Sequence, residues 1–384
     1  MDFLIRRAEP SDIEELLKLY FIVYQNKYPL PLGTDPKVML DLISRETNLW
    51  LVAVNPEKNK HLIASVVFEV DTFNKIGKLS GVVTHPDYRG KSLASKMIQL
   101  GSNQLLDPRS GLVDSVYTTT RTISKGPQVM CLNSGFRALG IFPNAHKLER
   151  HETLTLLAKH KEGVLQKRRF IDKIPEKLLP LYELTKDWGK HYQQPEVVHP
   201  TKKKIEHERR TPQEFEFIFA PKFVYSRFLE RFSNPHDRFY PFHKPNMVIC
   251  AGPTELYCYL SRQDRYCTII GTTVPLSTLV GRIPLLLEKL SDYGASYIEA
   301  LVGVDKIDAI HALLEFDFVP SAVYPAMRPE GDGYMDFVVM SHTMQPLNFA
   351  GMSVDSSFKP FIDQYVALWK QRHLDVLEVF KKNE

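Results

Sequence analysis

The chain has 384 residues, of which 43% are hydrophobic and 24% charged, and its formal net charge is +4. These values are ordinary for a globular protein of about two domains. No uncharged apolar run reaches the roughly 18 residues that a transmembrane helix needs, so we expect no membrane partner.

The cysteines and the charged runs further restrict the classes of protein to which the chain could belong. The four cysteines (Cys131, Cys250, Cys258 and Cys267) form no CxxC pair and no metal-ligand spacing with histidine. We therefore expect no metal and a reduced, cytoplasmic protein, and the first residues lack the apolar core and cleavage site of a signal peptide. The densest basic run, Thr201–Arg210, contains two glutamates, which favours a solvated linker over a nucleic-acid-binding patch. Nothing in the sequence indicates an oligomeric state.

The segment 1–160 predicts a mixed α/β domain. A strand at Phe3–Ala8 precedes a helix that Ser11 or Asp12 caps, with apolar residues at helical spacing up to Tyr24. The order that follows is helix, three strands, helix, strand, helix and two strands. The first helix and the three strands are at Pro36–Arg45, Leu49–Val54, Leu62–Val70 and Lys78–Thr84. A loop from Thr84 then runs into a helix that ends at about Leu106, and the remaining elements are at Asp114–Thr120, Pro127–Ser134, Phe136–Phe142 and Glu152–Ala158. This order predicts an antiparallel front and a parallel crossover.

Residues 161–215 are polar and rich in proline, and they predict a linker interrupted by one helix at Lys177–His191. After the linker the order is strand, strand, helix, strand, helix, strand, strand and helix, at Met247–Leu260, Tyr266–Val274, Leu276–Tyr293, Tyr297–Val304, Asp308–Leu314, Val319–Ala326, Tyr334–His342 and Phe358–Phe380. Pro284 bends the first of these helices or marks its start. We therefore expect a first domain at 1–160, a linker at 161–215 and a second domain at 216–384.

The second half repeats the first at a fixed offset in the numbering. Gly135-Phe136 and Phe142-Pro143 correspond to Asp317-Phe318 and Tyr324-Pro325, and the predicted strands at 114–120 and 152–158 fall on 296–302 and 334–340. A repeat of element order at a fixed spacing predicts two copies of one domain.

The segment Val82–Ser95 carries the strongest functional signal. It combines a strand end, a tight basic turn and a helix N-terminus with small side chains at Gly90, Ser92 and Ala94. Such a turn leaves backbone N–H groups without partners, and the helix dipole adds positive charge there. A pyrophosphate would fit this place; the alternative is an ordinary connection between a strand and a helix.

This segment resembles the acetyl-CoA loop of the GNAT acetyltransferase superfamily, whose pattern is Q/R-x-x-G-x-G/A. Arg89 and Ala94 fill the first and last positions, Ser92 stands where glycine is usual, and Pro86 and Tyr88 match the preceding context. We expect serine to be tolerated there at a helical φ. The resemblance, together with the repeat, implies an α/β fold of tandem GNAT-like domains, each with a mixed, mainly antiparallel central sheet flanked by helices.

The resemblance implies acetyl-CoA as the co-substrate. The backbone of the strand end would pair with the pantetheine arm, and the turn would hold the pyrophosphate. The residues implied are Val82, Val83 and Thr84 for the arm, and Arg89, Gly90, Lys91, Ser92, Leu93, Ala94 and Ser95 for the pyrophosphate. Gly135-Phe136 also matches the family; by itself the pair is also a helix C-cap followed by a core aromatic.

The implied reaction is direct attack of a neutral amine on the thioester, with a base for the amine and an acid for the leaving sulfur. Many members place a tyrosine acid four residues before the glycine of the Gly-Phe pair. Here that position is Cys131, for which packing is the favoured role, so the acid is unassigned. The base candidates are Glu69, Asp71 and His85, and His85 is equally well explained as a surface histidine.

Tyr117, Thr119 and Arg121 stand at or beyond the end of the next strand, where they would meet the amine or the thioester. Arg121 is a candidate for binding a substrate carboxylate, and a surface cation is the alternative. The run from Thr118 to Gly126, with Asn144 and Glu152, loosely resembles GNAT enzymes that acetylate lysine-like amino acids. A small amino-acid-like amine is therefore the favoured acceptor.

The second half lacks the cofactor motif, because its equivalent segment, Gly271–Leu279, has no cation and contains Pro275. We expect a degenerate copy that helps to shape the acceptor pocket; a separate binding module is the alternative. Phe232–Asn246 is either a lid or strap, or an ordered loop, and the loop is favoured. A non-catalytic protein that binds CoA or acyl-CoA is the alternative to an N-acetyltransferase.

Overall fold

The computed structural model describes residues 3–25, 28, 30–56, 61–147, 151–189, 193–200, 215–238 and 240–374. The basic run at 201–210 and the last part of the predicted C-terminal helix lie outside these residues. The chain divides into two compact units that interleave along the sequence. The first contains residues 1–120, 125–138 and 157–164, and the second contains residues 121–124, 139–156 and 165–384.

The first unit is built on a sheet whose strands follow the order β1-β2-β3-β4-β5-β7. These strands are β1 (Leu4–Arg7), β2 (Leu49–Val54), β3 (Leu62–Asp71), β4 (Ile76–Thr84), β5 (Ser115–Arg121) and β7 (His151–His160), of which Leu157–His160 belong to this unit. β1 to β4 pair antiparallel, whereas β4 and β5 are parallel. The predicted antiparallel front and parallel crossover are therefore confirmed.

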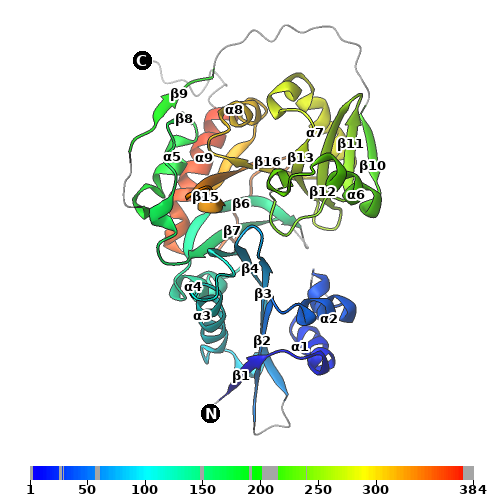
Figure 1. Cartoon of the computed structure of the whole chain (residues 1–384), viewed down its shortest axis with the longest axis vertical. Coiled ribbons are helices and arrows are strands. Elements are labelled where there is room, and N and C mark those ends of the chain that lie inside the picture. Colours follow the sequence, from blue (N-terminus) through cyan, green and yellow to red (C-terminus); the bar gives the residue numbers. More distant parts are fainter. Residues whose placement is uncertain are drawn as a thin grey trace. The chain divides into compact units, whose positions relative to one another are not determined.

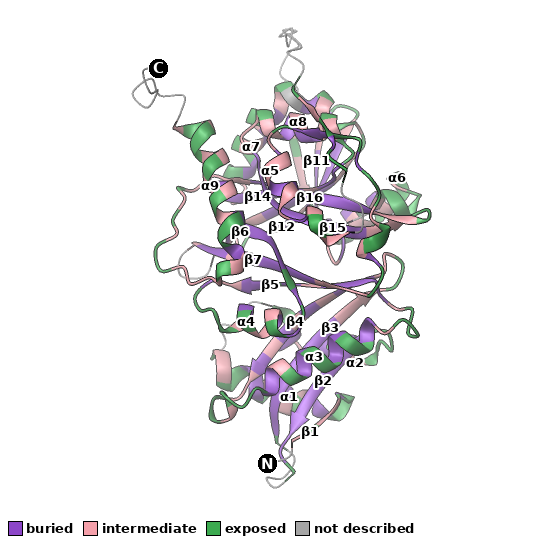
Figure 2. Cartoon of the chain, turned by 90° about the vertical axis from the view of Figure 1, so that its left-hand side faces the viewer, coloured by how far each residue is buried: buried purple, intermediate pink, exposed green. Residues whose placement is uncertain are grey.

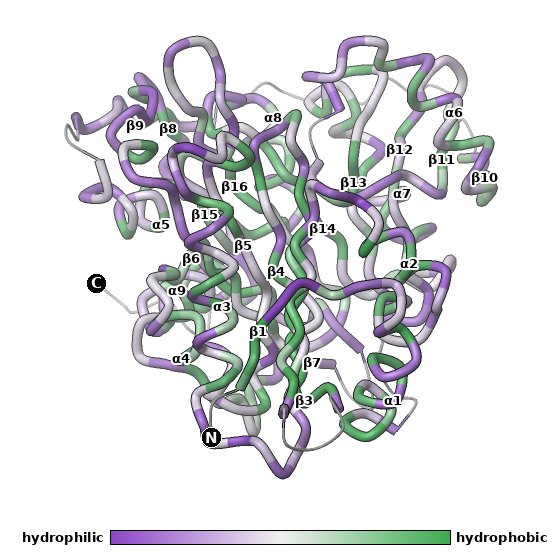
Figure 3. Tube along the Cα trace, turned by 60° about the horizontal axis from the view of Figure 1, so that its bottom comes forward, coloured by the Kyte–Doolittle hydropathy of each residue, from purple (hydrophilic) through white to green (hydrophobic). Residues whose placement is uncertain are grey.

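Helices cover both faces of this sheet (Figure 1). α1 (Ile13–Tyr24) and α2 (Pro36–Ser44) lie on one face, and α3 (Leu93–Leu105) and α4 (Gly126–Asn133) lie on the other. Because both faces are covered, every residue of β2 is buried, and Figure 2 shows β2 and β3 mostly in the buried colour. The tube of Figure 3 is correspondingly hydrophobic along β3.

The second unit has a mixed sheet in the order β7-β6-β15-β16-β14-β13-β12-β11-β10. β6 is Arg137–Lys147, and only its residues from Leu139 belong here. The other strands are β10 (Glu216–Phe219), β11 (Met247–Ala251), β12 (Thr254–Ser261), β13 (Tyr266–Thr272), β14 (Tyr297–Gly303), β15 (Val319–Glu330) and β16 (Gly333–Thr343). The helices are α6 (Pro221–Arg231), α7 (Ile283–Asp292), α8 (Ile307–Glu315) and α9 (Lys359–His373), and 3-10 turns lie at Pro235–Arg238 and Leu276–Arg282.

The two halves of the chain share backbone features at the offset of the predicted repeat. The strand order β10-β11-β12-β13-β14-β16-β15 matches β1-β2-β3-β4-β5-β7-β6, and the parallel pair, β13 with β14, stands at the same place. Gly135 and Asp317 both have a positive φ, 87° and 64°, as do Asn144 and Ala326, 61° and 48°. In β6 and β15, the equivalent residues Gly140 and Ala322 stand opposite each other in an antiparallel pair inside the second unit.

Several predicted elements need correction. The strand expected at 247–260 is a hairpin, β11 and β12, because Gly252 turns the chain with a φ of 60°. The helix expected at 276–293 begins as a 3-10 turn, and α7 starts only at Ile283, with Pro284 in its first turn. Strand β10 and helix α6 were not predicted.

The predicted linker is partly structured within the second unit. The helix expected at 177–191 is reduced to α5 (Leu179–Glu183) and a 3-10 turn at Lys186–Trp188. Two short strands, β8 (Lys173–Pro175) and β9 (Glu196–Val198), pair in parallel. Of the segment 232–246, Tyr240 is buried and donates to the carboxylate of Glu299 on β14, which fits the interpretation as an ordered loop.

A buried ion pair joins the residues before α5 to the sheet of the second unit. Arg168 donates to Asp336 on β16, with a shortest N–O distance of 2.5 Å and side-chain exposures of 9% and 0%. Arg168 also donates to the Thr185 carbonyl at 2.6 Å, and Asp336 accepts the Ala326 N–H at 2.7 Å. The pair thereby satisfies the backbone at the bulge of β15 as well as its own charges.

Replacing Arg168 by methionine is expected to lower the free energy of unfolding by about 3 kcal/mol, because the carboxylate of Asp336 would stay buried without its cation. Denaturant unfolding followed by circular dichroism measures the change. Arg169→Met is the matched control, since Arg169 pairs with Glu330 at an exposed site and should cost less than about 1 kcal/mol. Equal losses in the two variants would contradict the buried-charge argument.

Candidate functional site

The sheet of the first unit is irregular where β4 approaches its end. Ser65 of β3 pairs with Val83, whereas Val67 pairs with Ser80, so β4 contains an extra residue and bulges between them. Tyr20 of α1 donates a buried hydrogen bond of 2.9 Å to the carbonyl of Gly81 inside this bulge. The bulge thus changes the direction of the backbone of β4 just before its last residues.

β4 and β5 separate after a short parallel ladder. The ladder contains Ile76 opposite Ser115, Gly77 opposite Val116 and Lys78 opposite Tyr117. Beyond Lys78, the side of β4 that faces away from β3 pairs with no strand of the described chain. The backbone of Val82, Val83 and Thr84 therefore offers an open strand edge on that side.

The turn between β4 and α3 leaves a row of N–H groups unpaired. A 3-10 turn at Pro86–Tyr88 is followed by Gly90, with a φ of 76°, and Ser92, with a φ of 56°. In the described chain, the first helical hydrogen bond of α3 runs from the Lys96 N–H to the Ser92 carbonyl. The backbone N–H groups from Gly90 to Ser95 make no hydrogen bond within the described residues. The first turn of α3 contains no acidic residue, so its N-terminus is a place for an anion.

These residues fall within a recognised family. The model of the acetyltransferase (GNAT) family matches residues 11–122. This segment is a GNAT acetyltransferase domain. The match begins at the start of α1 and ends just after β5, so it includes the bulge, the open edge of β4 and the whole N–H row of the turn.

Solved structures of similar proteins match about two fifths of the chain. A GNAT acetyltransferase from Streptococcus pneumoniae is 20% identical, with 41% of this chain and 99% of that chain covered and a TM-score of 0.36. The ribosomal-protein-S18-alanine N-acetyltransferase from Escherichia coli is 16% identical, with 44% and 100% covered and a TM-score of 0.36. A comparison with curated proteins found no match.

Ser92 differs from its expected conformation in the GNAT domain. We expected a helical φ, but the residue is left-handed, a conformation that costs a side-chain-bearing residue about 1–2 kcal/mol. A glycine at this position would adopt the conformation without that cost. Gly90 is also left-handed, and a Cβ there would meet nothing within 4 Å, so only its backbone conformation matters.

We expect Ser92→Gly to stabilise the GNAT domain by roughly 0.5 kcal/mol, because the relief of strain exceeds the entropy that glycine loses on folding. Gly90→Ala should lower the free energy of unfolding by about 1 kcal/mol, because alanine is strained at a positive φ although its Cβ would touch no other atom. Urea unfolding of the full chain measures both changes. A destabilising Ser92→Gly would mean that the hydroxyl makes a contribution that outweighs the strain.

The cations of the turn differ in their surroundings. Arg89 is exposed, and its guanidinium has no hydrogen-bond or ion-pair partner within the described residues. Lys91 is exposed, with its Nζ 5.0 Å from the centre of the Tyr88 ring and 5.8 Å from that of Phe3. Arg89 is therefore the cation whose donors remain for a ligand.

Glu69, the candidate base, lies on β3 opposite Lys78. The Ser80 hydroxyl donates to its Oε1 at 3.4 Å, at the start of the bulge. Burial, Tyr24 and the charge of Glu69 raise the pKa of the Tyr28 phenol, which places Glu69 close to the aromatic cluster of Tyr20, Tyr24 and Tyr28. This carboxylate is thus near the bulge and close to phenolic groups.

The other two base candidates have structural roles. Asp71 accepts bonds from the Asn74 backbone at 2.9 Å and from its side chain at 2.7 Å, and it closes the turn between β3 and β4. His85 caps the 3-10 turn, because its Nδ1 accepts the Asp87 N–H at 3.3 Å, and its ring lies against Tyr88. Glu69 is therefore the candidate that the local structure leaves for chemistry.

Cys131 lies on α4 and is 4% exposed. Burial raises the pKa of its thiol to about 12, well above the ordinary value for a thiol near 8.5. A proton would have to move from this thiol to the more acidic thiol of a leaving group, which is uphill. The position of Cys131 thus fits the packing role, and the acid stays unassigned.

The remaining candidates lie on β5. Tyr117 is half-buried opposite Lys78, and Thr119 is exposed. Arg121 belongs to the second unit, where its Nε and Nη2 donate to both carboxylate oxygens of the buried Glu152, at 2.8 Å and 2.7 Å. Two of its donor groups are therefore already used by this bidentate pair.

Sequence reasoning missed Tyr20 and Tyr28, which pack together with ring centres 4.8 Å apart. The helical spacing that ends at Tyr24 indicated only a core face for Tyr20, and nothing local in the sequence predicts its hydrogen bond to Gly81. Among the described residues no group of three or more His, Cys, Asp or Glu side chains could hold a metal. Likewise, none of the described helices is long and apolar enough to cross a membrane.

Proposed function

We propose that this chain is an acetyl-CoA-dependent N-acetyltransferase that acetylates a primary amine. The observation that carries the proposal is the unpaired N–H row from Gly90 to Ser95, with the free guanidinium of Arg89 beside it and the open edge of β4 before it. The row and the guanidinium suit a pyrophosphate, and the strand edge suits the amides of a pantetheine arm.

The residues have separate roles in this proposal. The backbone of Val82, Val83 and Thr84 binds the arm, and the turn from Arg89 to Ser95 binds the phosphates. Bound acetyl-CoA supplies a thioester-activated acetyl group. Small side chains at Gly90, Ser92 and Ala94 allow the phosphates to approach the backbone closely.

On the acceptor side, we propose Glu69 as the base that takes the proton of the attacking ammonium. Its carboxylate also attracts a cationic amine before the proton leaves. Tyr117 and Thr119 are proposed to meet the amine or the thioester. Arg121 is proposed to bind a substrate carboxylate, in competition with Glu152, to which its Nε and Nη2 donate. The favoured acceptor is a small amino-acid-like amine.

We further propose tandem domains, with 216–384 a degenerate GNAT-like copy after a linker at 161–215. The matching strand order, the positive φ pairs and the fixed offset between equivalent residues support this. The turn after β13, which corresponds to the turn after β4, contains Pro275, which has no N–H group. A 3-10 segment at Leu276–Arg282 follows where the first unit has the N-terminus of α3. A separate binding module is the alternative, and two independently stable proteolytic fragments would favour it.

The direct test is turnover. The full chain is incubated with acetyl-CoA and a panel of primary amines that includes amino acids and diamines, and free thiol is measured with time. Sustained thiol release that depends on the amine supports an enzyme and excludes a protein that only binds CoA. Binding of acetyl-CoA without turnover on any amine would favour that sensor instead. A nucleic-acid partner is tested separately, because binding of nucleic acid weakens as salt is added. Binding of nucleic acid that does not change with salt would exclude such a partner.

A further inference from the structure

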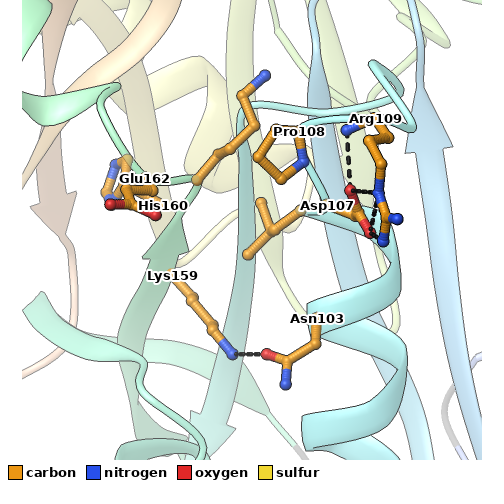
Figure 4. Close-up of a pocket in the computed structure, with 9 residues that line it drawn as sticks. Asn103, Asp107, Pro108, Arg109, Lys159, His160 and Glu162 are labelled. Atoms are coloured by element: carbon orange, nitrogen blue, oxygen red, sulfur yellow. Dashed lines mark hydrogen bonds and ion pairs between the residues drawn. The ribbon is translucent and has the colours of Figure 1, made fainter.

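The first unit contains a pocket of about 500 Å³ at the C-terminal end of α3, away from the turn at Arg89–Ser95. Its lining comes from the end of α3, the loop after it and the end of β7, as Figure 4 shows. Leu106 and Pro108 form an apolar part of the wall, and Lys159 enters from β7. No role in the proposed transfer involves this pocket.

Lys159 is held in an unusual way for a lysine. Its Nζ donates to the Asn103 Oδ1 at 2.6 Å and to the Ser102 hydroxyl at 3.1 Å, and both acceptors are neutral. No carboxylate pairs with it within the described residues. Its side chain crosses Gly135, where a Cβ would lie 3.4 Å from the lysine Cε. Burial without a counter-charge lowers the pKa of this amine.

The neighbouring cations of the pocket are compensated. Lys161 pairs with Asp114, and Arg109 pairs with Asp107 at 2.6 Å. A carboxylate holds an amine in its charged form, in which it has no lone pair for attack. Two N–H groups of the Lys159 ammonium donate to neutral oxygens. When the third N–H group loses its proton, the nitrogen has a lone pair for attack.

We propose that Lys159 is an acylation site, modified by small acyl thioesters such as acetyl-CoA from solution. In the step, the neutral Nζ attacks the thioester carbonyl carbon, the N–C bond forms as the C–S bond breaks, the thiolate leaves and the extra proton passes to water. The amide formed keeps one N–H for Asn103. The pocket has room for the acetyl group, and Leu106 and Pro108 offer an apolar wall for its methyl.

The acyl donor is not the molecule proposed to bind at the turn. From Leu93 to Asn103 the helix rises by about 15 Å, so the phosphate row and Lys159 lie at opposite ends of α3. The modification is therefore independent of the proposed catalytic site. A variant that cannot bind acetyl-CoA at Arg89 should still be acylated at Lys159.

The experiment incubates the full chain with acetyl-CoA and no amine, digests it after glutamate and follows the peptide 153–162 by tandem mass spectrometry. Lys159 and Lys161 are both in this peptide, so Lys161 is an internal control. We expect Lys159 to be acetylated about fivefold faster than Lys161 at neutral pH, because more of it is neutral. Equal rates would overturn the proposal.

Two variants separate the site from its surroundings. Asn103→Asp preserves the shape of the side chain but places a carboxylate next to the Lys159 Nζ. The variant should slow acetylation of Lys159 about tenfold and shift the pH dependence of that rate to higher pH. Arg89→Glu should leave the rate unchanged, so a failure of the proposed enzyme function stays distinguishable from a failure of this inference. An unchanged rate in Asn103→Asp, or a loss in Arg89→Glu, would contradict it.

Discussion

Arg89→Glu is expected to weaken binding of acetyl-CoA about a thousandfold, or roughly 4 kcal/mol. The wild-type guanidinium has no partner within the described residues, so its donors are available for phosphate oxygens. The variant loses these charge-assisted bonds and places a carboxylate against the pyrophosphate. Calorimetric titration of acetyl-CoA into the full-length proteins measures the loss.

The matched control is Arg109→Glu, which makes the same change of charge beyond the other end of α3. Its side chain is 90% exposed and pairs only with Asp107 among the described residues. We expect its affinity for acetyl-CoA to stay within about twofold of the wild type, because a Debye length near 10 Å screens distant exposed charges. If the wild type itself does not bind, the turn is an ordinary connection and the proposed function fails.

Glu69→Gln is expected to lower kcat about a thousandfold at neutral pH, because general base catalysis contributes roughly 10²–10⁴-fold. The affinity for acetyl-CoA should stay unchanged. Much of the activity should return as the pH rises toward the pKa of the substrate amine, since the amine then loses its proton in solution. Steady-state rates between pH 7 and 10 measure this dependence.

Asp71→Asn makes the same change of carboxylate to amide two residues along the chain. Because Asp71 closes the β3–β4 turn, the variant should affect stability and leave kcat near that of the wild type. Glu69→Asp should restore part of the activity if the carboxylate takes the proton. If Glu69→Gln retains full kcat at neutral pH, the base is another group.

The sequence predicted what depends on local chemistry. Apolar spacing and capping residues located α1 to α4 within a few residues, and the motif from Arg89 to Ala94 predicted a helix N-terminus suited to an anion. Fixed spacing also predicted a repeat, and Gly135 and Asp317, which this spacing makes equivalent, both have a positive φ. Local patterns decided these features, so no structure was needed for them.

Other features depend on contacts between distant residues. The bidentate pair of Arg121 with Glu152 and the bond from Tyr20 to Gly81 follow from sheet register, which a single sequence does not specify. The left-handed Ser92 could not be inferred because serine is ordinarily helical or extended. The hairpin at Gly252 was missed because the apolar residues on either side of the Gly-Pro pair predict one continuous strand.

The register of β6 against β15 pairs two positions that the proposed repeat makes equivalent. Gly140 faces Ala322, which lies at the fixed offset from it, and a Cβ at Gly140 would lie 2.2 Å from the Ser321 carbonyl. An antiparallel pair in which equivalent residues face each other is the arrangement that identical subunits make across a two-fold axis. If the two halves are the copies that we propose, β6 and β15 make within one chain the contact that two identical subunits would make across such an axis.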